Sequence, residues 1–336
     1  MYRAFRLRLF FLLLLLAVVL HISGCGSTSS SREQSANHQG SVKTVHTTNE
    51  QTESQSLLTR TYKDAYSDVE IPASPQKIAV LLDYFSDPLL TLGIKPYAAT
   101  TSLVNDQFLP YIAKEMEGVI PIGSSESLNM ERLLESEPDL IIAFGPSHEK
   151  VADQLRKIAP TIFISSELQG DWRQMLLEFG KIVGKEELAQ QELKKYLDKV
   201  EATKIELDKR AGDEVFVVMR VMPKELRVYG VDDTRIGRII HQELDLQGVK
   251  LEGNKPMMPI SFEELPALNP DHIFLMENVE KEAKNKLAEM KNSAVWKGLS
   301  AVQKNQVYIV EQQLWNRGVT PIGANHIIDQ VLEFVK

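Results

Sequence analysis

Cysteine is almost absent from this sequence, because its 336 residues include one, Cys25. A single cysteine excludes a disulfide within the chain and a zinc site built from several thiolates. The sequence also lacks the G-x-S-x-G turn, the phosphate-binding P-loop and the G-x-G-x-x-G dinucleotide motif. The metal-binding spacings H-x-H and H-E-x-x-H are missing as well. These absences argue against a hydrolase, a nucleotide-binding enzyme and a protein that captures a metal ion directly.

Long apolar runs are also scarce, and the longest extends from Leu9 to Leu20, after Arg3, Arg6 and Arg8. This run of about a dozen residues is shorter than the roughly 20 needed to cross a bilayer as a helix. A basic start, a short apolar run and small residues after it are typical of a secretory signal peptide. We therefore assign residues 1–24 to a signal peptide.

Cys25 directly follows this segment, in the sequence Ile22-Ser23-Gly24-Cys25, which resembles a bacterial lipobox. The resemblance implies that the signal is cut before Cys25 and that diacylglycerol is attached to its sulfur. Two or more acyl chains anchor a protein stably, whereas a single chain does not. We therefore predict a lipid anchor at Cys25 that holds the protein on the extracytoplasmic face of the cell membrane.

The mature chain is predicted to be acidic and tethered. Cleavage removes three arginines and no acidic residue, so the formal net charge changes from −8 to −11. An acidic surface disfavours nucleic acid and anionic lipid as partners. Residues 25–60 are rich in Ser, Thr, Gln and Asn. Because such a segment cannot bury enough apolar surface to fold, we predict a flexible tether after the lipidated cysteine.

From residue 61 onward, short apolar runs alternate with helical patterns. Buried strands are predicted at residues 77–82, 140–144, 161–164, 215–219, 227–229, 272–276 and 307–310. Helices are predicted at residues 130–136 and 148–158, and a last one from Pro321. This alternation is typical of βαβ units and parallel sheets.

A longer helical pattern divides these strands into two groups. It runs from Asp171 to about Ala211, is interrupted at Gly184, and predicts one long or once-broken helix. We therefore assign an N-terminal lobe to residues 61–170, an interlobe helix to 171–211 and a C-terminal lobe to 212–336.

An internal repeat indicates that the two lobes share one plan. Residues 129–133 (NMERL) and 261–265 (SFEEL) are each followed, at the same spacing, by Pro-Asp and an apolar strand. Two α/β lobes joined by a helix have a cleft between them, and ligands usually bind in such clefts.

Five segments resemble iron-siderophore and cobalamin-binding lipoproteins of the periplasmic-binding-protein-like class. They are residues 129–144 (NMERLLESEPDLIIAF), 148–161 (HEKVADQLRKIAPT), 217–230 (VVMRVMPKELRVYG), 260–274 (ISFEELPALNPDHIF) and 315–324 (WNRGVTPIGA). The resemblance implies an α/β fold with two Rossmann-like lobes, whose central, mostly parallel sheets are joined by a single long helix. It also implies a binding protein, not an enzyme, that captures an iron(III)-siderophore and delivers it to an ABC importer.

The resemblance further implies how the protein meets the importer. In this family one glutamate on each lobe contacts the permease dimer, and the corresponding residues here are Glu131 and Glu263. Both lie near a predicted helix start, where the helix dipole favours a carboxylate. We expect a monomer that docks on the permease, which works with its ATPase.

A ferric siderophore is a compact, oxygen-rich complex, so its site needs fixed cations and aromatic walls. Arginine suits this role because its planar guanidinium makes paired hydrogen bonds and keeps its proton. Arg220 ends a predicted strand, Arg227 begins the next, and Arg317 follows Trp315 by two residues. Strand ends face the crevice in open α/β sheets, where ligands bind. Arg235 and Arg238 fit a following helix and are expected to be solvated.

Aromatic and polar residues complete the predicted ligand site. Tyr84, Ser147 and His148 follow strands of the N-terminal lobe, and Tyr229 ends a strand of the C-terminal lobe. Trp315 is expected to lie in a loop and to form a wall of the cleft.

We expect no resident cofactor, because iron would be bound through the siderophore and not directly by side chains. Siderophores of the hydroxamate and the citrate or carboxylate types are favoured. Three alternatives remain open at this point: haem, cobalamin or free metal on the same fold, an extracytoplasmic enzyme, and a structural or adhesive lipoprotein.

Overall fold

The computed structural model describes residues 58–336, apart from residues 234 and 279. The predicted signal peptide, Cys25 and nearly all of the predicted tether lie outside these residues. No helix within the described part is long and apolar enough to span a bilayer.

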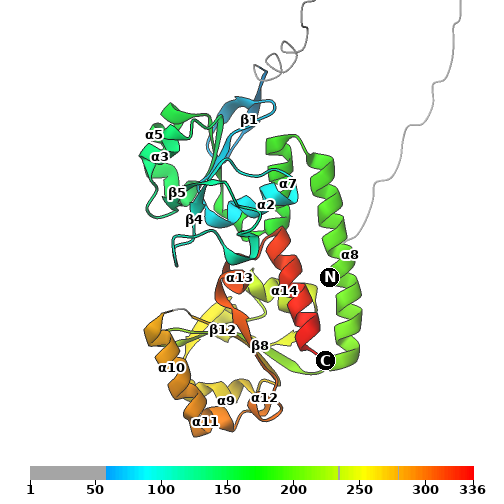
Figure 1. Ribbon diagram of the computed structural model, residues 1–336. Helices are drawn as coiled ribbons and strands as arrows, with labels where there is room; N and C mark the ends of the chain where they lie inside the picture. Colours follow the sequence, from blue (N-terminus) through cyan, green and yellow to red (C-terminus); the bar gives the residue numbers. More distant parts are fainter. Residues whose placement is uncertain (1–57, 234, 279) are drawn as a thin grey trace, which may run out of the picture. The chain divides into compact units, whose positions relative to one another are not determined.

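Five parallel strands form the sheet of the N-terminal lobe, in the order β5-β4-β3-β6-β7 (Figure 1). Their bounds are β3 (Ile78–Val80), β4 (Ala98–Thr101), β5 (Ile120–Ser124), β6 (Leu140–Phe144) and β7 (Thr161–Ile164). Strands β6 and β7 are buried at every position, as parallel strands covered on both faces must be. An antiparallel hairpin of β1 (Thr59–Lys63) and β2 (Asp68–Pro72) precedes this sheet.

Short helices connect the strands of this lobe. They are η1 (Asp83–Phe85), α2 (Ser86–Thr91), η2 (Pro110–Ile112), α3 (Met130–Glu135), α4 (Gly145–His148), η3 (Glu149–Val151), α5 (Ala152–Ile158) and α6 (Ser166–Gly170). Helix α3 begins where the side chain of Asn129 accepts a hydrogen bond from the backbone N–H of Arg132.

The sheet of the C-terminal lobe has the order β11-β9-β8-β12-β13, and the short β10 also pairs with β8. Its strands are β8 (Val215–Val221), β9 (Leu226–Tyr229), β10 (Gln247–Gly248), β11 (Met257–Ile260), β12 (His272–Glu277) and β13 (Val307–Glu311). β8, β12 and β13 run parallel, whereas β9 is antiparallel to both of its neighbours, β8 and β11. Both lobes therefore contain a central, mostly parallel sheet, as the resemblance implies.

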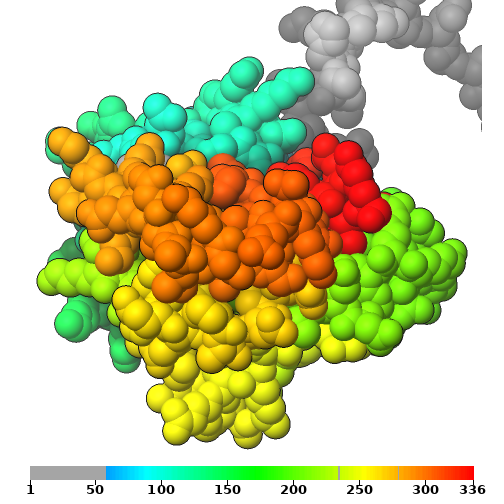
Figure 2. All heavy atoms as spheres, turned by 90° about the horizontal axis from the view of Figure 1, so that it is seen from below, coloured from blue at the N-terminus to red at the C-terminus, as the bar shows by residue number. Residues whose placement is uncertain are grey.

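The helical elements of the C-terminal lobe cover its sheet and carry the chain to its end. They are the π-helical turn η4 (Arg238–Glu243), η5 (Glu252–Asn254), η6 (Phe262–Glu264), α9 (Leu265–Leu268), α10 (Lys281–Asn292), α11 (Ala294–Lys297), α12 (Ser300–Gln303), α13 (Gln312–Arg317) and α14 (Pro321–Phe334). Seen from below, α10 to α12 (orange) and the segment around residue 250 (yellow) make up much of the visible face (Figure 2).

Two helices, α7 (Trp172–Val183) and α8 (Glu186–Ala211), connect the lobes. Helix α7 ends at Gly184, whose left-handed backbone (φ 69°) suits glycine because it has no Cβ. The two helices pack against each other, and α14 (red) packs along α8 (green) and reaches α2 and α7 (Figure 1). The predicted break at Gly184 thus separates two packed helices.

The structure explains why both copies of the internal repeat contain a Pro-Asp pair. The carboxylate of Asp139 accepts hydrogen bonds from the backbone N–H groups of Gln76 (2.6 Å) and Lys77 (3.0 Å), just before β3. In the other lobe, Asp271 accepts one from Val215 (3.1 Å), at the start of β8. Each Pro-Asp pair therefore fixes the start of the first strand of its own sheet, which a turn residue alone would not explain.

Candidate functional site

The carboxyl end of β3 brings Asp83 and Tyr84 to the side of the N-terminal lobe that meets the C-terminal lobe. Both residues lie in η1 and are 3% exposed. The Tyr84 hydroxyl accepts a hydrogen bond from the side-chain amide of Gln169 in α6. Asp83 Oδ1 accepts one from the Tyr84 N–H (3.0 Å). Burial raises the pKa of Asp83, and the charge of Arg317 counteracts that shift.

Two arginines of the C-terminal lobe reach across to this pair. The guanidinium carbon of Arg317 lies 5.6 Å from the centre of the Tyr84 ring, and that of Arg235 lies 5.9 Å from it. Arg317 Nε is 3.5 Å from Asp83 Oδ2, and Arg235 donates to the carbonyl oxygen of Asn316 (2.6 Å). The N-terminal lobe thus supplies the tyrosine ring, and the C-terminal lobe supplies two cations that lie near it.

Two more arginines are neighbours on the sheet of the C-terminal lobe. Arg220 of β8 is directly opposite Arg227 of β9 in the antiparallel register. Arg227 donates to Glu225 (2.8 Å), whereas the buried Nε of Arg220 has no hydrogen-bond partner among the described residues. A buried, unsatisfied guanidinium nitrogen is costly unless a ligand acceptor meets it.

Tyr229 lies close to these charges. Its side chain is 7% exposed at the end of β9. Burial raises its pKa, and the positive charges of Arg220 and Arg227 oppose that rise. Tyr84, Tyr229 and the four arginines Arg220, Arg227, Arg235 and Arg317 are hereafter called the interlobe face.

Trp315 does not belong to this face, and the prediction that it lies in a loop is wrong. Residues 312–317 form helix α13, because the Glu311 carboxylate accepts hydrogen bonds from the backbone N–H groups of Gln313 and Leu314 at its start. Trp315 is 0% exposed, its indole N–H donates to Gln330 (2.7 Å), and its ring packs on Phe274. It is a core residue of the C-terminal lobe.

Ser147 and His148 follow β6 as predicted but lie in helix α4. Ser147 is exposed, whereas His148 is buried with its Nδ1 3.0 Å from the carbonyl oxygen of Phe144. Burial lowers the pKa of His148. No hydrogen bond or ion pair within the described ranges joins either residue to the four arginines.

Arg235 and Asp83 were not predicted from the sequence to belong to the ligand site. Arg235 was expected to be solvated, and Arg238, expected to be solvated too, pairs with Asp171 (2.9 Å). Asp83 follows the first buried strand and directly precedes Tyr84, and this position could have identified it as a site residue. Asp83 is paired with Arg317 of the other lobe, and Arg235 donates to Asn316, 81 residues away, so local patterns could not reveal these contacts.

Glu131 and Glu263 occupy equivalent places on the two lobes. Each is exposed and lies in the first turn of a helix, α3 and η6 respectively. A capping box between Ser261 and Glu264 starts η6, as Asn129 starts α3. Both carboxylates are therefore presented to solvent from capped helix starts.

The described residues contain no group of three or more His, Cys, Asp or Glu side chains that could hold a metal ion. The buried histidines are engaged elsewhere, since His241 contacts the Leu246 carbonyl and His272 contacts Glu214 and Tyr308. The face between the lobes instead offers cations and phenols, which suit an oxygen-rich ligand.

The sequence resembles known proteins over most of its length. A family model described as "Periplasmic binding protein" matches residues 81–314. The iron(3+)-hydroxamate-binding protein FhuD of Bacillus subtilis is 31% identical over 305 residues, which cover 89% of this chain and 88% of that protein. The probable siderophore-binding lipoprotein YfiY of the same organism is 29% identical and covers 95% of each chain.

A solved structure also matches this fold. The Staphylococcus aureus protein SirA, complexed with staphyloferrin B, superposes with a TM-score of 0.71. It is 29% identical in sequence, and the match covers 82% of this chain and 98% of that one.

Proposed function

Because the chain belongs to the periplasmic binding protein family, we propose that it captures a ferric siderophore outside the cell and passes it to an ABC importer. The observation that carries this proposal is on the interlobe face, where Arg235 and Arg317 of the C-terminal lobe lie 5.9 Å and 5.6 Å from the ring of Tyr84 of the N-terminal lobe. Relatives named for binding iron(III)-hydroxamate, iron(III)-citrate and other siderophores support it. The same relatives are binding proteins, in keeping with the expectation that the chain is not an enzyme.

Each part of the face contributes differently to binding. Arg220 and Arg227 are cross-strand neighbours, and their guanidinium groups would donate to the oxygens of a hydroxamate or carboxylate. Arg235 and Arg317 lie near the Tyr84 ring and would supply positive charge to the ligand from the C-terminal lobe. Iron enters inside its chelator, so no side chain has to act as a metal ligand and no resident cofactor is required.

Two further features place the protein in an import system. A diacylglyceryl group on Cys25 would anchor it to the extracytoplasmic face of the membrane, with the following residues as the tether. The predicted tether extended to residue 60, but Thr59 and Arg60 belong to strand β1, so the tether ends before them. Glu131 and Glu263, exposed on equivalent helix starts, would dock on the permease dimer, one from each lobe. Like the expected monomeric state, these assignments remain predictions.

A calorimetric titration of residues 58–336 against ferric hydroxamate, ferric citrate and ferric catecholate complexes, with haem and cobalamin as rivals, tests the proposal. Calorimetry is preferable to tryptophan quenching because Trp172, Trp296 and Trp315 are all buried. We expect saturable binding of one ferric class with a dissociation constant of about 1 μM or tighter. If only haem or cobalamin binds, the fold assignment stands but a ferric siderophore is excluded as the ligand.

A further inference from the structure

Asp83 is a buried carboxylate beside Arg317 of the interlobe face. Its side chain is 2% exposed, and it is placed by the end of β3 and the Tyr84 N–H. Its second oxygen, Oδ2, has no hydrogen-bond partner within the described residues, and its nearest cation is Arg317 Nε at 3.5 Å. A carboxylate is costly to bury, so the positive charge of Arg317 is needed there in the protein itself.

The four arginines of the interlobe face are thus unequal. Arg227 already has Glu225 at 2.8 Å, and Arg317 already has Asp83. Arg220 and Arg235 have no carboxylate within 4.0 Å in the described part of the chain. The charge left for a ligand is therefore smaller than the number of arginines indicates.

We infer that Asp83 is a specificity-determining residue, which occupies the charge of Arg317 and so disfavours ferric complexes bearing several carboxylates relative to neutral ferric hydroxamates. This inference rests on the proposed function and names its substrate class. A carboxylate of the ligand that approaches Arg317 meets the negative charge of Asp83 at the same place. The oxygens of a neutral hydroxamate complex carry no net charge and escape most of that repulsion.

The place of Asp83 makes this repulsion effective. Glu225 is 35% exposed, so water and salt screen its charge. Asp83 is a buried residue of η1, and charges in a buried position are screened far less. A like charge built into a site is a common means of rejecting the wrong ligand.

The test compares Asp83→Asn with the unaltered protein in calorimetric titrations against ferric dicitrate, which is anionic, and ferrichrome, which is a neutral trihydroxamate. We expect the variant to bind ferric dicitrate about tenfold more tightly, while its affinity for ferrichrome changes by less than about twofold. If the unaltered protein binds ferric dicitrate too weakly to measure, the variant should gain measurable binding.

Two further variants complete the test. Asp83→Ser also removes the charge and keeps an oxygen that can accept the Tyr84 N–H, so it replaces Asp83→Asn if that variant does not fold. Asp198→Asn removes an exposed carboxylate that pairs with Lys194 on α8, and it should alter neither affinity.

Two results would overturn the inference. Unchanged affinity for ferric dicitrate would show that Asp83 does not oppose anions, and weaker binding of both complexes would show that Asp83 merely positions Arg317. In both cases the unaltered protein still binds a ferric complex, so the proposed function stands. If the unaltered protein binds neither these complexes nor a ferric catecholate, the proposed function fails and the inference fails with it.

Discussion

The side chain of Arg220 has the least satisfied charge on the interlobe face. It extends from a strand in which Val217, Val218 and Met219 are fully buried. Its Nε atom is buried and has no partner among the residues described. A guanidinium group in this position is ready to bind an oxygen anion at little cost of reorganisation, because the strand already fixes its stem.

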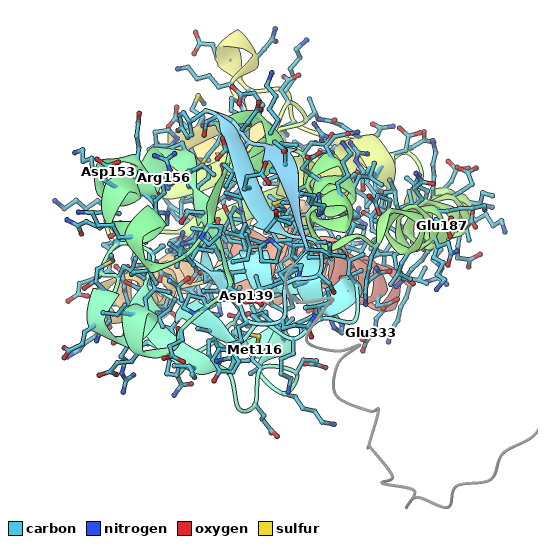
Figure 3. The ribbon with its side chains drawn as sticks, turned by 90° about the horizontal axis from the view of Figure 1, so that it is seen from above. Met116, Asp139, Asp153, Arg156, Glu187 and Glu333 are labelled. Carbon is cyan, nitrogen blue, oxygen red and sulfur yellow. The ribbon has the colours of Figure 1, made fainter. Side chains whose placement is uncertain are left out.

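Replacement of Arg220 by glutamate should therefore abolish most of the affinity. We expect Arg220→Glu to raise the dissociation constant for the bound ferric complex about 100-fold, measured by calorimetry. Arg156→Glu is the matched control, because Arg156 lies on α5 and its ion-pair partner is Asp153 of the same helix (Figure 3). An Arg220→Glu protein that folds and binds as tightly as the control would remove Arg220 from the site.

At the scale of single residues, sequence reasoning located strand-end side chains better than their partners. Tyr84 and Arg220 could be found because an apolar run fixes where a strand ends. Trp315 could not be placed, because helix α13 depends on the Glu311 carboxylate at its start and on the burial of the indole against Phe274. The role of Arg235 required its contact with Asn316, 81 residues away.

Helix α14 is held at its start by a residue of the other lobe. The Asp87 carboxylate, in α2, accepts hydrogen bonds from the N–H groups of Ile322 (2.9 Å) and Gly323 (3.1 Å) and from the Thr320 hydroxyl. Asp87 is 0% exposed, and burial raises its pKa, an effect that these hydrogen bonds oppose. A carboxylate at a helix N-terminus is favoured by the dipole, so Asp87 joins the two lobes.

Loss of this carboxylate should loosen the junction between the lobes. We expect Asp87→Ala to lower the free energy of unfolding by about 3 kcal/mol, since it leaves buried donors unsatisfied. Hydrogen exchange at the first turn of α14 should become faster. Asp198→Ala, which removes an exposed ion pair with Lys194, should change stability by less than about 0.5 kcal/mol. Equal stability of the two variants would contradict the role given to Asp87.

Strands made of large apolar residues were predicted well, whereas strands with small, polar or turn-forming residues were not. Strands β6 and β7 have the predicted bounds, because LIIAF and TIFI suit strands covered on both faces. Strand β4 was missed because AATT contains small and polar residues, although all four are buried. Strand β5 was missed because it contains Pro121 and Gly123 and adjoins β4 through an irregular register.

At the scale of the whole molecule, the repeat gives each lobe the same exposed acidic helix start. Glu131 and Glu263 stand out only when the two lobes are compared, because nothing in the local chemistry of either residue marks it. This matching is the reason for assigning both to the permease contact.

Charge reversal at these two positions should separate delivery from capture. We expect Glu131→Lys and Glu263→Lys each to lower uptake of the ferric complex by cells about tenfold, while calorimetric affinity stays within about twofold. Glu187→Lys, an exposed glutamate of α8 (Figure 3), is the control and should leave uptake intact. Normal uptake by both charge-reversed proteins would exclude these residues from docking.

The most direct test of the central claim is the position of iron in crystals of the protein grown with its ferric siderophore, located from the anomalous scattering of the metal. The account predicts one strong iron peak at the interlobe face, with the chelator contacting Arg220 and Tyr84. A peak elsewhere, such as the cavity lined by His272 and Tyr308 at the far end of the C-terminal lobe, would contradict it. Bound iron coordinated directly by protein side chains would contradict it equally.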